Sequence, residues 1–174
     1  MPAMPILLQI GLLYGGLMSL GIMIVMGLGL ALNPALFVGD YPPDIRAKYG
    51  PLDAHGQRQK YLIAIPFLAA IVGPLVALVV HLDGLVAGEP PFGAIFLAAF
   101  VAALVFNVVD LLIIDWLFVV TLRPRIIVLP GTEGMAGYRD YAFHFRGFLI
   151  GLGFCAVSGL LTALIAAGIY ALLP

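Results

Sequence analysis

The chain has 174 residues, of which 63% are hydrophobic and only 10% are charged. Soluble domains carry about 25% charged and about 45–50% apolar residues, because their surfaces must face water. This composition excludes a water-soluble enzyme and a soluble nucleic-acid-binding protein, and the formal net charge of −1 gives no attraction to polyanions. The expected fold class is therefore all-α, in a small polytopic membrane protein.

Charge-poor segments predict the number of membrane spans. A span needs about 20 mostly apolar residues to cross about 30 Å of hydrocarbon, and lipid favours helices because a helix satisfies its own backbone hydrogen bonds. We predict a single transmembrane domain over residues 1–174, a bundle of four helices in two hairpins. The predicted helices cover about residues 6–32, 61–82, 93–121 and 141–173. Two long loops, 33–60 and 122–140, and a short turn, 83–92, connect them.

The first predicted helix is expected to stay in the mature protein rather than to be cleaved as a signal peptide. No Lys or Arg precedes it, whereas a signal peptide begins with a basic region. Its apolar stretch is also about twice as long as the apolar region of a signal peptide. It therefore counts as one of the four spans.

The basic residues predict the orientation of the bundle. Lys and Arg accumulate in cytoplasmic loops, near the ends of the spans. All eight of them fall in or beside the two long loops: Arg46, Lys48, Arg58, Lys60, Arg123, Arg125, Arg139 and Arg146. We therefore predict that both long loops are cytoplasmic and that both termini and the short turn are outside, in a bacterial-type plasma membrane.

Small residues recur at every fourth position of the last predicted helix. Such ladders let two helices approach closely in lipid, where the hydrophobic effect does not drive helices together and close packing must do so instead. The helix-packing ladder comprises Gly147, Gly151, Cys155, Gly159 and Ala163. It predicts tight packing within the bundle, and a seam between two copies in a homodimer is the alternative.

The third predicted helix carries the candidate intramembrane polar site: Asn107, Asp110 and Asp115. An ionised carboxylate at the centre of a bilayer costs about 3 kcal/mol on insertion scales, so such groups are paired, protonated or functional. Asn107 and Asp110 share a helical face and are expected to point into the bundle, where Asp110 could bind a proton or cation. Alternatively, Asp115 pairs with Arg146 or Arg123 and only pins the helices together.

The second long loop and the start of the last helix hold candidates for binding a phosphate or a lipid headgroup. Arginine forms paired hydrogen bonds with phosphate oxygens. The candidates are Arg123, Arg125, Arg139, His144 and Arg146. The alternative is that these charges only set the topology. Asp140 and His144 lie four residues apart and are expected to share a hydrogen bond, and the chain has no spacing of His or Cys typical of a metal site.

Three functions remain open. The favoured one is a non-catalytic integral membrane protein, an accessory or scaffold subunit that packs through its small-residue helix faces. The second is a small proton- or cation-coupled transporter or channel that uses Asp110 and Asn107. The third is a membrane enzyme or lipid-binding protein that uses the arginine-rich cytoplasmic face. Expected partners are the lipid bilayer, anionic lipid, a second copy of the chain or a membrane partner subunit, and we predict neither a cofactor nor catalytic residues.

Overall fold

A computed structural model describes residues 2–86 and 88–172, and every regular element in these ranges is helical. Four stretches are long and apolar enough to cross a membrane: α1, α3, α4 continued by η2, and α5. In chain order the elements are α1 (Met4–Leu32), η1 (Pro34–Asp40), α2 (Pro43–Tyr49), α3 (Ala54–Asp83), α4 (Phe92–Val109), η2 (Asp110–Leu122), η3 (Ala136–Arg139) and α5 (Tyr141–Leu172).

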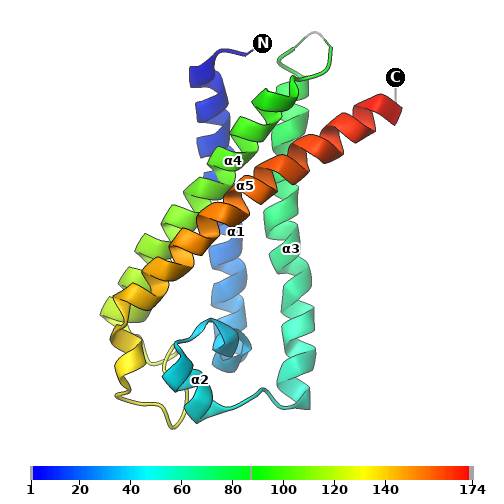
Figure 1. Cartoon of the computed structure of the whole chain (residues 1–174). Coiled ribbons are helices and arrows are strands. Elements are labelled where there is room, and N and C mark those ends of the chain that lie inside the picture. Colours follow the sequence, from blue (N-terminus) through cyan, green and yellow to red (C-terminus); the bar gives the residue numbers. More distant parts are fainter. Residues whose placement is uncertain (1, 87, 173–174) are drawn as a thin grey trace.

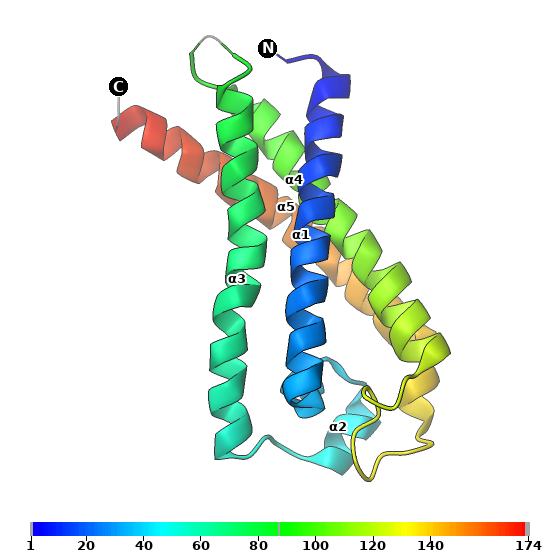
Figure 2. The ribbon, with the colours of Figure 1, turned by 180° about the vertical axis from the view of Figure 1, so that it is seen from behind.

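The central helix of the bundle is α4, which packs between α1 and α5, whereas α3 packs mainly against α1. Figure 1 shows the start of α1, the end of α3 and the end of α5 at one end of the bundle, and Figure 2 shows the same arrangement from behind. The two long connections lie together at the opposite end, near α2. The basic residues of both connections therefore gather at one end of the molecule.

The helix α3 begins at Ala54, although the sequence predicts a start at 61. The side chain of Asp53 caps this helix, because its Oδ1 accepts a hydrogen bond of 2.7 Å from the backbone N–H of Gly56. Polar residues at the start of α3 thus extend the helix beyond its apolar part. The preceding α2 forms a short helix within the first long connection, and Gly50 with a positive φ of 86° ends it.

Glycine and alanine bring α1 and α4 into close contact. A Cβ atom added at Gly15 would lie 2.6 Å from Cβ of Val105 and 2.7 Å from the carbonyl oxygen of Ala102. The facing surface of α4 consists largely of alanine, and Ala98 and Ala102 are completely buried. Small side chains on both helices therefore allow backbone-to-backbone packing, which is how helices associate without a hydrophobic driving force.

The ladder of the last helix lies partly against α4 in the same chain. A Cβ atom at Gly159 would lie 2.9 Å from the carbonyl oxygen of Phe96, and Cys155 and Ala163 are buried. Gly147 has no neighbouring atom within 4 Å of such a Cβ atom. The middle of the ladder thus serves packing within one bundle.

The two long connections fold together into a loop module, which comprises residues 34–49 and 123–140. Its own small apolar core contains Ala35, Tyr41, Ile45, Ile127, Leu129 and Tyr138. The hydroxyl of Tyr41 donates a hydrogen bond of 2.7 Å to the carbonyl oxygen of Ile127 and so joins the first connection to the second. Ile127 and Leu129 therefore pack in this small core, whereas Ile126 is exposed.

We expect Tyr138→Phe to loosen this module. The hydroxyl of Tyr138 accepts a hydrogen bond of 2.9 Å from the backbone N–H of Leu129 and lies 2.7 Å from Oγ1 of Thr132, and all three residues are buried. Losing these bonds should lower the free energy of unfolding by about 1–2 kcal/mol. Thermal unfolding in detergent measures the change. Tyr61→Phe is the matched control, because Tyr61 is 73% exposed, and an equal effect of both variants would contradict the assignment.

Candidate functional site

The third span changes its hydrogen-bond pattern at Asp110. From Asp110 to Leu122 the helix is of the π type, whose characteristic hydrogen bond runs from an N–H to the carbonyl five residues earlier. The same five-residue spacing recurs where Arg123 N–H donates to the carbonyl of Phe118, at 2.9 Å. π-Helical segments are rare in proteins, and those that occur often lie at functional sites.

The π pattern places Asp115 on the same side of the span as Asp110. In an α-helix, residues five positions apart point about 140° away from each other. In η2 such residues lie nearer to one face of the helix than they do in an α-helix, because five residues separate the bonded partners. The two carboxylates therefore face one region of the bundle, although α-helical geometry puts Asp115 on the flank of this face.

The main feature of this region is a pair formed by Asp115 and His144. The Oδ1 atom of Asp115 lies 2.8 Å from Nδ1 of His144 and joins η2 to the first turn of α5. The side chain of His144 is 6% exposed, and that of Asp115 is 21% exposed. Because a carboxylate can only accept, Nδ1 of His144 carries the hydrogen of this bond.

The other ring nitrogen of His144 has no hydrogen-bond partner among the described residues. Its Nε2 atom is buried and, within residues 2–86 and 88–172, makes no hydrogen bond, and the same holds for Nε1 of Trp116. Nearly all buried polar atoms in proteins are bonded, since an unsatisfied one costs about 1–3 kcal/mol. The bond to Asp115 orients Nε2, and the lone pair of Nε2 can accept a proton or a hydrogen bond.

Asn107 joins α4 to α5 and serves packing. Its Nδ2 donates a hydrogen bond of 3.1 Å to the carbonyl of Phe148, and its amide fills the space beside Gly151, where any added Cβ atom would overlap it. Asn107 thus holds α5 against α4 through its Nδ2 and the bulk of its amide. It contributes to the position of α5, on which His144 lies.

Two further carboxylates act on the pair. Asp110 is half-buried, and its ionisable neighbours are Asp115, Asp40 and His144. Asp40 is exposed at the surface, but the surrounding protein partly desolvates its carboxyl and raises its pKa; Lys60 opposes this rise, and the negative charge of Asp115 adds to it. We call Asp40, Asp110, Asp115 and His144 the Asp–His cluster. In the described part of the chain, no three His, Cys, Asp or Glu side chains gather closely enough to hold a metal ion.

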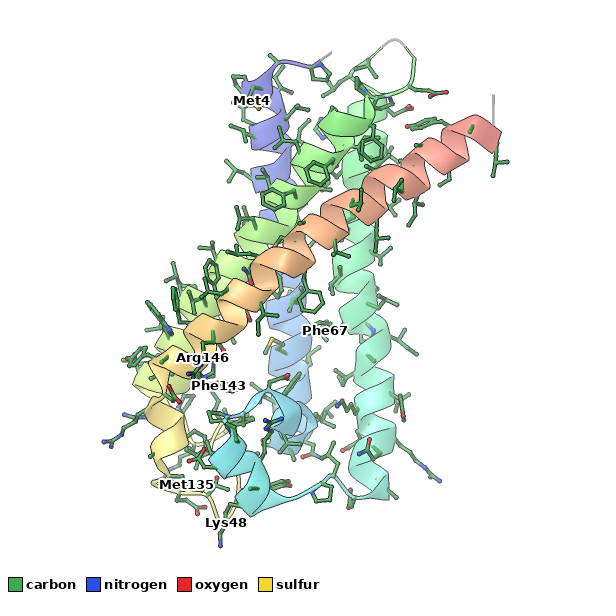
Figure 3. The ribbon with its side chains drawn as sticks, viewed as in Figure 1. Met4, Lys48, Phe67, Met135, Phe143 and Arg146 are labelled. Atoms are coloured by element: carbon green, nitrogen blue, oxygen red, sulfur yellow. The ribbon has the colours of Figure 1, made fainter. Side chains whose placement is uncertain are left out.

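Two pairings predicted from the sequence are wrong. Asp115 pairs with His144 rather than with Arg146 or Arg123, because both members of the pair lie on facing sides of η2 and α5. Asp140 instead accepts a hydrogen bond of 2.9 Å from the backbone N–H of Phe143 and lies 3.9 Å from Arg146. Figure 3 shows Arg146 and Phe143 in the first turns of α5, at the end of the bundle opposite Met4.

The predicted phosphate candidates do not form one site. His144 is buried in its pair with Asp115, whereas Arg146 is 68% exposed. Arg123 and Arg139 line one common hollow, and Arg125 is exposed outside it. The five residues thus separate into a buried histidine, two arginines that converge and two that do not.

Comparisons with protein families, with curated proteins and with solved structures found no match to this chain.

Proposed function

We propose that this chain is an integral membrane protein that binds and releases protons at the Asp–His cluster and moves a proton or another cation across the membrane. The observation that carries the proposal is the pair of Asp115 and His144, in which the buried Nε2 atom of the histidine lacks a partner. This arrangement supports the transport hypothesis over a purely structural one, because a structural histidine normally has both nitrogens bonded.

The chemistry follows from the two ring nitrogens. Histidine changes its charge near neutral pH, and its tautomer is set by the bond that the other nitrogen makes. Here Asp115 holds the hydrogen on Nδ1, so Nε2 presents a lone pair. A proton that arrives at Nε2 produces an imidazolium, which the carboxylate of Asp115 stabilises. Asp110 lies one π turn away on the same side and offers a second acceptor.

The location in the membrane suits such a role. Figure 3 places Lys48 and Met135 at the end of the bundle where the two long connections meet. Asp110, Asp115 and His144 lie next to this end, in η2 and the first turn of α5, and Asp40 ends η1 in the first connection. We propose that this end is cytoplasmic, because all the basic residues gather there, and that the membrane is of the bacterial plasma-membrane type. Since four helices leave little room for a path, we further propose that two copies act together.

Proton movement in liposomes tests the proposal. The purified protein is reconstituted into vesicles that contain a pH-sensitive dye, and a potassium diffusion potential drives proton entry. We expect the parent to acidify the lumen faster than empty vesicles do, and Asp115→Asn and His144→Gln to reduce this rate to that of empty vesicles. Asp110→Asn should reduce it in part, because Asp110 is a neighbour of the pair rather than a member.

Glu133→Gln is the matched control for this experiment. It also removes one carboxylate at the same end of the bundle, but Glu133 is exposed in the loop module. Its rate should equal that of the parent. If the parent acidifies no faster than empty vesicles, or if all four variants acidify as the parent does, the proposed function is wrong.

The exposed face of α3 favours a second candidate, an accessory subunit. Tyr61, Ile65 and Leu68 are each more than 60% exposed, and few side chains of this helix are buried in the bundle. A membrane partner could pack on this face as readily as lipid does. Cross-linking from a reactive group at position 65, followed by identification of the captured chain, distinguishes a partner from lipid.

A further inference from the structure

A hollow lies on the loop module beside the end of η2. Its volume is about 210 Å³, and two arginines line it together with backbone and apolar groups. The lining residues are Arg123, Val128, Gly134, Met135, Tyr138 and Arg139. The hydroxyl of Tyr138 is already bonded within the module, so the arginines are the polar groups that remain for a ligand.

Neither arginine forms an ion pair with a carboxylate in the described part of the chain. Within residues 2–86 and 88–172, the ion pairs are those of Asp115 with His144 and of Asp140 with Arg146. Arg139 also lines a neighbouring hollow together with Asp44 and Asp140, but no carboxylate lines the hollow that Arg123 and Arg139 share. Like charges that converge in a partly desolvated place repel each other, and an anion between them removes this repulsion.

The backbone of Arg123 adds a second observation. Its φ and ψ are 42° and 58°, in the left-handed region, where residues other than Gly, Asn and Asp are uncommon. A glycine would end η2 at this point without strain. The arginine thus occupies a position that disfavours it, and strained positions concentrate where a side chain binds a ligand.

The surroundings of the hollow indicate the source of the anion. Arg123 directly follows η2, the last part of a membrane span, and exposed apolar side chains flank it on both sides. Leu122 is 58% exposed and Ile126 is 43% exposed. A ligand with a phosphate group and an acyl chain would satisfy both features, since its phosphate enters the hollow and its chain follows η2.

We propose that this hollow binds a phosphate group and that the phosphate belongs to the headgroup of a membrane lipid. Arginine forms two parallel hydrogen bonds with phosphate oxygens, and basic pockets at the cytoplasmic side of membrane helices bind anionic headgroups. The proposal is independent of proton movement, because it uses none of the residues of the Asp–His cluster. It assigns to Arg123 and Arg139 a role that the other arginines do not share.

Titration of the protein in a phosphate-free maltoside detergent tests the site. The probes are a short-chain phosphatidylglycerol, a diacylglycerol with the same acyl chains and inorganic phosphate, and calorimetry or native mass spectrometry measures binding. We expect the phosphatidylglycerol to bind at least about tenfold more tightly than the diacylglycerol. Binding of inorganic phosphate with the same affinity as the lipid would support the phosphate site but reject the lipid as its source.

Two variants and one control connect the binding to the arginines. Arg139→Gln changes an exposed side chain and should weaken phosphatidylglycerol binding about tenfold without loss of folding. Arg123→Gly should weaken binding similarly and yet raise the unfolding temperature, because glycine relieves the left-handed backbone. Arg125→Gln is the control and should bind as the parent does. The proposal is overturned if the two variants bind like the control, or if the diacylglycerol binds as tightly as the phosphatidylglycerol.

Discussion

Replacing Gly15 by alanine is expected to lower the free energy of unfolding by about 2 kcal/mol, although the change adds a single methyl group. The new Cβ atom would lie 2.6 Å from Cβ of Val105 and 2.7 Å from the carbonyl oxygen of Ala102. Because the second of these is a backbone atom, rotation of a side chain does not relieve the overlap, and α1 must move away from α4. Unfolding in detergent measures the loss of stability.

The neighbouring glycine provides the matched control. Gly16 is exposed, and a Cβ atom added there meets no atom within 4 Å. Gly16→Ala should therefore be neutral or stabilise the helix by less than about 1 kcal/mol, since alanine is the better helix former. Equal losses in the two variants would show that glycine at these positions serves something other than the contact of α1 with α4.

The second large effect is expected at the pair of Asp115 and His144. Asp115→Ala removes the acceptor of a buried histidine, and breaking a buried pair on one side costs about 3 kcal/mol, because the other member keeps its desolvation cost without its partner. His144→Ala should cost a similar amount, with a contribution from the cavity that the ring leaves. Chemical unfolding of the two variants in detergent measures these losses.

A double variant separates pairing from packing. In Asp115→Leu combined with His144→Phe, no polar group remains to be satisfied, so stability should return to within about 1 kcal/mol of the parent. The same protein should be inactive in the vesicle experiment, since it keeps the fold but loses the group that accepts a proton. Additive losses in the double variant would mean that the two side chains do not act as a pair.

The sequence predicts the spans well because their signal is strong and local. Long charge-free segments and two clusters of basic residues are sufficient to place four membrane helices and to group the loops at one end. The small residues of the last helix likewise predict close packing, because only small side chains let two helix backbones approach closely. All of these predictions depend on composition within one segment and not on contacts between segments.

The site could not be derived in the same way, for two physical reasons. The π-helix begins at Asp110 without a glycine or proline to mark it, so α-helical angles misplace Asp115 relative to Asp110. The partner of Asp115 lies on another helix, whereas local spacing predicts a bond of His144 with Asp140, because residues four apart on a helix are neighbours. The available signal is that Asp115 and His144 lie at a similar depth in the membrane. Using this signal requires knowing how deep each residue lies in its helix.

The bond between Tyr41 and Ile127 divides the molecule differently from its order along the chain. The first hairpin contributes α1 and α2 to a unit that also contains α4, η2 and α5, whereas α3 packs mainly against α1, with fewer contacts to α4 and η1. Only the hydroxyl of Tyr170, which donates a hydrogen bond of 2.9 Å to Asp83, joins α5 to α3 by a side-chain hydrogen bond in the described part of the chain. The span that buries the fewest of its described residues is thus an internal one, α3, and not a span at either end of the chain.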